Sequence, residues 1–234
     1  MRLDKYLSAC GFGTRSEVKK IIKQGLVTVD GEASRDQGMH VEPGANAVEC
    51  NGEAAVYREH VYVMLHKPAG VVSATGDRWH DTVLDLLDGA YPERELFPVG
   101  RLDRDATGLL LLTDDGALAH ELLSPKKHVE KVYEALLDKP VDQADMDAFI
   151  NGIKLEDFTA KPAKLEGMGG SKAMVALTEG KFHEVKRMFE ARGKNVLELK
   201  RTAMGSLLLD DSLKPGEWRE LTQEEEKALK QRDS

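Results

Sequence analysis

Hydrophobic positions recur with helical spacing at the start of the chain and then change to strand spacing. Leu3–Ala9 predicts a short amphipathic helix. A capping box at Thr14 opens a second helix, and Gly25 is placed to end it. Leu26–Val29 predicts a strand that turns at Asp30 and the glycine after it. The pattern therefore predicts a compact N-terminal unit built from two helices and a hairpin.

Beyond residue 60 the pattern consists of short apolar runs separated by turn residues. Four consecutive leucines, Leu109–Leu112, are typical of a strand buried on both faces. Because strands often follow one another without a helix between them, we expect an α+β fold with a mixed, mostly antiparallel sheet. Including a short strand before residue 60, the expected strands are residues 47–50, 61–65, 71–74, 109–113, 131–137, 173–177, 196–201 and 206–209, and the expected helices are 82–87, 117–123, 146–151, 184–192 and 223–232.

The chain has 234 residues, enough for one large domain and one small one. The segment between the hairpin and residue 60 is rich in Gly, Glu and Asn and contains only short apolar runs. We therefore predict a small domain over residues 1–58 and a larger domain over residues 59–234.

The composition is that of an ordinary globular protein, with 41% hydrophobic and 32% charged residues. No apolar run is long enough to span a membrane, and the N-terminus has no apolar segment typical of secretion. Cys10 and Cys50 do not show the spacing of a metal site, and a disulfide is not expected without export. We expect a cytoplasmic monomer that does not associate with membranes.

The net charge of −8 argues against a nucleic-acid partner, but the charge is unevenly distributed. Residues 1–25 and residues 181–201 each carry a net charge of +4, as expected for contact with a polyanion. Arg15, Lys19 and Lys23 recur every four residues and share one face of the second helix. That face is either an ordinary solvated surface or a surface that lies on an RNA backbone.

A charged, turn-rich stretch from Gly100, with a turn predicted at Thr107 and Gly108, leads directly into the leucine strand. Asp103 lies in this stretch between two arginines, which favour its ionised form. An ionised carboxylate at the edge of a core is a candidate catalytic group, although a solvated loop with mutually paired charges has the same sequence. Tyr133 is either a packing residue of its strand or a ring that stacks on a base. Lys186 lies at the edge of the apolar stripe of a predicted helix. It is either an ordinary surface lysine or a lysine whose ammonium faces a cleft.

Other common chemistries have no sequence signal. The seven histidines show no metal-ligand spacing, and no Gly-rich phosphate loop follows a strand. There is also no nucleophile elbow of the Gly-x-Ser-x-Gly type. We therefore expect neither a metal nor a cofactor.

Several motifs occur together in the order typical of one family. The stretch Gly100 to Gly108, Gly-Arg-Leu-Asp-x-Asp-x-Thr-Gly, resembles the central motif of the RsuA-type pseudouridine synthases. Residues 1–45 resemble the small RNA-binding module named after ribosomal protein S-four. The other matching motifs are Lys67-Pro68-x-Gly70, Thr113-Asp114-Asp115-Gly116, Ser124-Pro125-Lys126-Lys127-His128, Lys131-x-Tyr133 and Glu179-Gly180-x-x-His183-x-Val185-Lys186-Arg187-Met188-Phe189.

The resemblance implies a role for particular residues of this chain. Asp103 would be the catalytic carboxylate, Tyr133 would stack on a flipped uracil, and Lys186 would pair with Asp103. Arg101 would help to displace the target base, and Leu199 would pack beneath the uracil. RNA contacts would fall on Arg187, Arg2, Arg15, Lys19 and Lys23.

One position departs from the family pattern. The residue after the motif histidine is often Gln in the family, but here it is Glu184. This substitution predicts an extra negative charge close to Lys186.

The implied reaction isomerises a specific uridine of ribosomal RNA to pseudouridine. The short acidic tail, with Glu224, Glu225 and Glu226, resembles the enzyme of small-subunit (16S) rRNA more than the large-subunit (23S) members with long basic tails. One alternative is a non-catalytic rRNA-binding or ribosome-assembly protein. A carboxylate glycoside hydrolase would need Asp105 or Asp114 as a second acid, and no spacing supports that arrangement.

Overall fold

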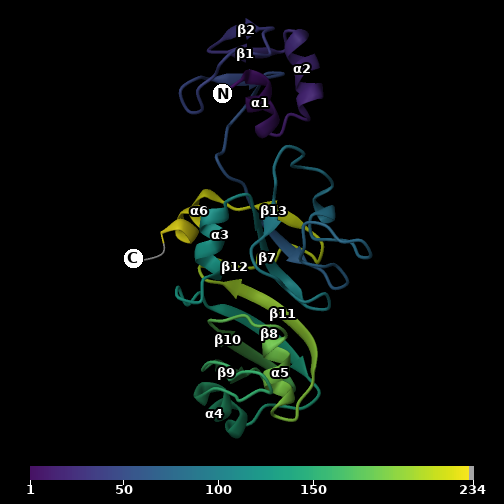
Figure 1. Ribbon diagram of the computed structural model, residues 1–234, viewed down its shortest axis with the longest axis vertical. Coiled ribbons are helices and arrows are strands. Elements are labelled where there is room, and N and C mark those ends of the chain that lie inside the picture. The colour runs from purple at the N-terminus through teal and green to yellow at the C-terminus, as the bar shows by residue number, and fades with distance from the viewer. Residues whose placement is uncertain (232–234) are drawn as a thin grey trace. The chain divides into compact units, whose positions relative to one another are not determined.

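The computed structural model describes residues 1–231 and divides into two compact units (Figure 1). The first unit comprises Met1–Val61 together with Leu87–Leu96, and the second comprises Tyr62–Leu86 and the residues from Phe97 onward. Leu87–Leu96 joins the first unit through Arg94, whose guanidinium donates to the carbonyl of Glu59 at 2.8 Å. The sequence pattern does not indicate that Leu87–Leu96 belongs to the first unit. The domain boundary predicted after residue 58 stays a prediction.

The first unit packs two helices on a small antiparallel sheet. The capping box at Thr14 is confirmed: its side chain accepts from the backbone N–H of Glu17, whose carboxylate accepts from the N–H of Thr14. Apolar residues of both helices and of the first strand, among them Leu3, Leu7 and Val27, are fully buried. The elements are α1 (Leu3–Ala9), α2 (Arg15–Lys23), β1 (Val27–Val29), β2 (Glu32–Ser34), β3 (Val48–Cys50) and β4 (Glu53–Ala54), with sheet order β2-β1-β3-β4.

The second unit is built on one large sheet. Its main path, within the described residues, runs in the order β13-β5-β7-β11-β8-β10-β9, with β12 paired to β11 and β6 to β7. Only the β7–β11 pair is parallel among these described strands, so the predicted α+β fold with a mostly antiparallel sheet is confirmed. The strands are β5 (Tyr62–Lys67), β6 (Phe97–Pro98), β7 (Thr107–Thr113), β8 (Lys131–Leu137), β9 (Lys164–Gly167), β10 (Lys172–Leu177), β11 (Val196–Met204), β12 (Leu207–Leu208) and β13 (Trp218–Glu220).

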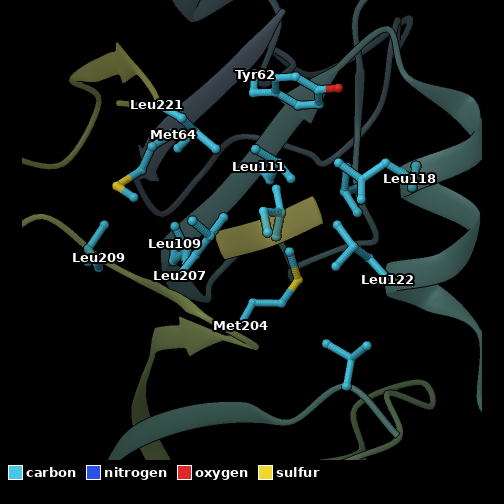
Figure 2. Close-up of a cluster of buried hydrophobic side chains, with 14 residues drawn as sticks. Tyr62, Met64, Leu109, Leu111, Leu118, Leu122, Met204, Leu207, Leu209 and Leu221 are labelled. Atoms are coloured by element: carbon cyan, nitrogen blue, oxygen red, sulfur yellow. The ribbon is translucent and has the colours of Figure 1, made fainter. Parts of the chain in front are cut away.

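Strand β7 lies in the middle of the core. All four of its leucines are fully buried, which confirms the prediction of a strand covered on both faces. On one face, Leu109 and Leu111 belong to a hydrophobic cluster with Leu118 and Leu122 of α3 (Gly116–Leu123), as Figure 2 shows. This burial anchors the strand whose N-terminal end carries the Asp103 loop.

Gly108 allows the two central strands to approach closely. The prediction of a turn at Thr107 and Gly108 is wrong, because both residues belong to β7. Gly108 has φ +104°, and a Cβ atom there would lie 2.2 Å from the carbonyl oxygen of Arg201 on β11. A larger residue would therefore push apart the two halves of the sheet.

The remaining helices differ from the predictions mainly at their ends. α4 (Gln143–Asn151) begins earlier than predicted because Asp142 and Asp145 form a capping box. α5 spans Glu184–Glu190, and α6 spans Gln223–Lys230; the last residue predicted for the terminal helix, Arg232, lies outside the described residues.

Two predictions between β5 and β6 are wrong. Residues 71–74 form no strand and make only an isolated bridge from Val72 to Thr82. The helix predicted over residues 82–87 is a single 3₁₀ turn, η1 (Asp85–Leu87). The turn stops because the next two residues, Asp88 and Gly89, both adopt positive φ values.

Candidate active site

The loop that carries Asp103 is held by side chains from a distant part of the sequence. The Ser73 hydroxyl donates to the Leu102 carbonyl at 2.9 Å and accepts from the Leu102 N–H at 3.1 Å. On the other side of Asp103, the Gly70 N–H donates to the carbonyl of Arg104 at 2.7 Å. The carboxylate of Asp103 is therefore presented by a backbone that is fixed at both ends.

Lys67 completes this support from beneath the loop. Its side chain is fully buried, and Nζ donates to the carbonyls of Pro68 and Ala106, each at 2.9 Å, and of Arg104 at 3.3 Å. Burial lowers the pKa of Lys67 to about 8, against the opposing effect of the Asp105 and Asp103 carboxylates. This lysine belongs to the Lys67-Pro68-x-Gly70 motif, and the motif alone does not indicate its supporting role.

The predicted partner of Asp103 is present. Lys186 Nζ lies 3.4 Å from Asp103 Oδ2, and His183 Nε2 lies 3.5 Å from Asp103 Oδ1. Among the described residues Arg101 makes no ion pair with Asp103, although both side chains line the same cavity.

Lys186 also binds a second carboxylate. Its Nζ lies 2.6 Å from Oδ1 of Asp105, which is 75% exposed, whereas Asp103 is 25% exposed. The hydrogen bond from Lys186 lowers the pKa of Asp105. Asp105 therefore belongs to the site as well, because Lys186 binds both Asp105 and Asp103.

Helix α5 determines where Lys186 projects. Val185, Met188 and Phe189 are buried, and the ring of Phe189 packs on Phe149 of α4 with centroids 5.0 Å apart. This apolar anchor leaves Lys186 at the edge of the helix, as its spacing predicts, with its ammonium directed to the Asp103 loop.

Asp103 opens onto a small inner cavity of about 60 Å³. Tyr133 and Leu199, both buried, line this cavity together with Arg101 and Asp103. Their strands are neighbours: β8 and β11 are antiparallel, and β11 runs parallel to β7 at the point where the Asp103 loop enters it. The sheet thus brings together residues that are almost 100 positions apart in sequence.

A larger cavity of about 590 Å³ shares part of the same lining. Arg101, Asp103 and His183 line both cavities, and Arg104 and Phe182 line only the larger one. The site therefore combines a small cavity of mixed polar and apolar lining with a wider one that carries Arg101 and Arg104, an arrangement that can accept a flat base and its phosphate backbone.

Glu184 differs from its prediction. It is 4% exposed, and its Oε2 accepts from the N–H of Lys181 at 2.9 Å. Burial, together with a hydrogen bond to the Glu179 carboxylate and the charge of that carboxylate, raises the pKa of Glu184 to about 7. Glu184 therefore faces Glu179 and Lys181, and protonation of its carboxyl reduces the extra negative charge predicted beside Lys186.

Most basic side chains of the second basic segment, residues 181–201, bind other groups of this protein. Arg187 binds Asp157, and Arg192 and Lys194 bind the buried Asp145. Arg201 is buried and donates to the carbonyl of Leu109 at 2.8 Å. The charge of this segment therefore does not form a free surface as predicted, since tertiary acceptors neutralise it. An RNA contact by Arg187 stays a prediction.

Two of the predicted RNA-binding residues of the first unit, Arg2 and Lys19, form ion pairs with Asp4. Arg2 Nε lies 3.1 Å from Asp4 Oδ1, and Lys19 Nζ lies 3.9 Å from Asp4 Oδ2. Arg15 and Lys23 are exposed on α2. The Arg2 hydrogen bond opposes the effect of burial and keeps the pKa of Asp4 below its usual value.

The described residues, 1–231, contain neither a metal-binding cluster nor a membrane-spanning helix. No group of three or more His, Cys, Asp or Glu side chains in this range is placed to hold a metal ion. No helix in the same range is both long and apolar enough to cross a membrane.

Comparison with known proteins identifies the family. The family model described as RNA pseudouridylate synthase matches residues 61–191, which include every residue of the Asp103 site except Leu199. The chain belongs to the RNA pseudouridylate synthase family. The S4 domain model matches residues 1–46, so this pseudouridine synthase also carries an S4 domain.

Similar proteins extend over almost the whole chain. An uncharacterised RNA pseudouridine synthase of Bacillus subtilis is 47% identical over 96% of both chains. The ribosomal small subunit pseudouridine synthase A of Escherichia coli is 40% identical over 96% of this chain and 98% of its own. A crystal structure of a pseudouridylate synthase matches with a TM-score of 0.69 and 38% identity, and covers 98% of this chain and 99% of that one. These matches confirm the predicted family and enzyme class.

Proposed function

We propose that this pseudouridine synthase modifies one uridine of small-subunit ribosomal RNA, with Asp103 as its catalytic carboxylate. The observation that carries the proposal is the convergence of Asp103, Tyr133 and Leu199 on one small cavity from three separate segments, with Lys186 paired to Asp103. The choice of small-subunit rRNA is supported by the 40% identity to the E. coli small-subunit enzyme over nearly the full chain.

The reaction exchanges one bond of the uridine for another. The N1–C1′ bond breaks, the uracil rotates in its pocket, and a C5–C1′ bond forms. The C5 proton is lost to solvent, and N1 takes up a proton, so atoms and electrons balance without an oxidant or reductant. Asp103 begins the reaction either by adding to C1′ or by removing a proton from the sugar. Both routes need an ionised carboxylate.

Each neighbour of Asp103 has a role in this scheme. Lys186 stabilises the ionised carboxylate at 3.4 Å. Tyr133 and Leu199 bind the uracil in the inner cavity, where the ring must remain while it is detached from the sugar. Arg101, exposed at the entrance, occupies the space left in the RNA when the base is extruded.

RNA affinity is divided between the two units. We propose that Arg2, Arg15, Lys19 and Lys23 of the S4 domain contact phosphates and supply the salt-dependent part of binding. The catalytic unit then selects the uridine.

The test uses rRNA tritiated at uracil C5. Wild-type protein is expected to release tritium from small-subunit rRNA, Asp103→Asn to release none, and Asp105→Asn to retain activity. Asp105→Asn is the matched control, because both carboxylates contact Lys186. Activity in Asp103→Asn would refute the assignment of the catalytic residue.

The same assay separates the alternatives. Tritium release only from large-subunit rRNA would show that the substrate is 23S rRNA. Tight binding of rRNA without release from any RNA would instead indicate a non-catalytic RNA-binding protein and overturn the proposed activity.

A further inference from the structure

One aromatic ring beside the active site is exposed to an unusual degree. Phe182 is 71% exposed, although large aromatic side chains usually bury most of their surface. One face of its ring stacks on the imidazole of His183, with centroids 3.8 Å apart and planes 17° apart. Because His183 covers only one face, the opposite face of Phe182 is open.

The loop that carries this pair is held in place. His183 adopts the left-handed conformation, with φ 51° and ψ 28°, which is uncommon for a residue other than glycine. Its carbonyl accepts from the N–H of Arg187 at 2.9 Å, and the Lys181 N–H donates to the Glu184 carboxylate at 2.9 Å. The backbone on both sides of Phe182 is therefore fixed, so the exposed ring has a defined position.

The pair lies where an RNA strand entering the site would pass. Phe182 and His183 line the larger cavity together with Arg101, Asp103 and Arg104. His183 is in direct contact range of the Asp103 carboxylate, at 3.5 Å. Exposed arginines on the same cavity provide partners for phosphates next to the ring. A stacking ring beside a cationic groove is the usual arrangement for binding an unpaired nucleotide.

We propose that the open face of Phe182 stacks on the base of a nucleotide adjacent to the target uridine. This subsite rests on the proposed function, because it requires that the uridine enter the Asp103 cavity. It would bind a single-stranded neighbour without reading its hydrogen-bonding edge, since every base offers a π face. Single exposed apolar residues are common on proteins, but this ring is fixed, stacked on one side and next to the reacting carboxylate.

The test uses the full-length protein and an rRNA fragment that wild type modifies. 2-Aminopurine, whose fluorescence is quenched by stacking, replaces the nucleotide on the 5′ or the 3′ side of the target. Wild type and Phe182→Trp are expected to quench one of the two probes, whereas Phe182→Ala and Phe182→Leu do not. KM for the fragment is expected to rise at least fivefold in the Ala and Leu variants, with a smaller change in kcat.

Leu208→Ala is the matched control, because Leu208 is an exposed apolar side chain that lines neither cavity. It should leave quenching and KM unchanged. Wild-type values in Phe182→Ala would overturn the subsite, and wild-type values in Phe182→Leu would overturn stacking as its basis. These outcomes differ from failure of the proposed function, in which wild type itself releases no tritium from any rRNA.

Discussion

The buried carboxyl of Glu184 makes the stability of the catalytic unit depend on pH. The pKa of this group is about 7 in the folded protein, against an ordinary value of 4.5. Between these two pH values the unfolded chain releases the proton while the folded protein retains it. The free energy of unfolding therefore falls as pH rises through this window.

The size of the effect follows from the shift in pKa. A change from 4.5 to about 7 corresponds to about 3 kcal/mol of stability, lost as the pH rises through about 7 and constant from about pH 8 upward. The side chain is almost fully buried, so solvent screening does not reduce this figure substantially. Glu184→Gln cannot ionise, and its amide can still donate to Glu179. We expect the variant to match wild type near pH 4.5 and to exceed it by about 3 kcal/mol at pH 8.

Tryptophan fluorescence reports the unfolding of the second structural unit, which contains Glu184. The two tryptophans of the chain, Trp79 and Trp218, both lie in the second unit, so their signal reports its unfolding. Urea titrations from pH 4.5 to 8 give the free energy of unfolding, and thermal scans should show a melting point raised by roughly 6–12 °C at pH 8.

Glu190→Gln is the control, because it removes an exposed carboxylate from the same helix. Equal pH dependence in wild type and Glu184→Gln would refute the reasoning about a buried proton. The same gain in Glu190→Gln would show instead that the effect comes from the general charge of α5.

Three further experiments test other parts of the structure. Gly108→Ala should destabilise the protein by about 3 kcal/mol or more in urea titrations, because its Cβ would clash with the backbone of β11, whereas Gly116→Ala, with open space around it, should not. Lys67→Met should lower kcat at least tenfold in single-turnover tritium release, because three carbonyls of the loop region lose their donor; an unchanged kcat would contradict this. Arg15→Ala with Lys19→Ala should reduce the slope of log affinity against log salt by about 1.5 in filter-binding assays, and an unchanged slope would exclude phosphate contacts by this helix face.

Local patterns were sufficient wherever the physical cause is local. The capping box at Thr14, the apolar faces of the first helices and the buried leucine strand follow from spacing and from neighbouring residues, and the structure confirms them. The ordered motifs likewise identified the family, since residue identity and order are properties of the chain itself.

Errors arose where tertiary contacts change the meaning of a local pattern. Gly108 was predicted to lie in a turn because the sequence does not show the second strand that it faces. Residues 71–74 are apolar, yet their loop runs alongside Thr82 instead of joining the sheet. The basic segment from 181 to 201 looked like a free positive surface until the fold supplied acidic partners such as Asp145.

The candidate site shows the same division. The sequence alone determined which residue types are available and that Asp103 precedes a buried strand. Only the tertiary structure decided that Lys186 is shared with Asp105, that Lys67 supports the loop, and that Glu184 retains a proton. Each of these depends on the distance between groups far apart in sequence, or on their burial, and both quantities exist only once the sheet has brought its strands together.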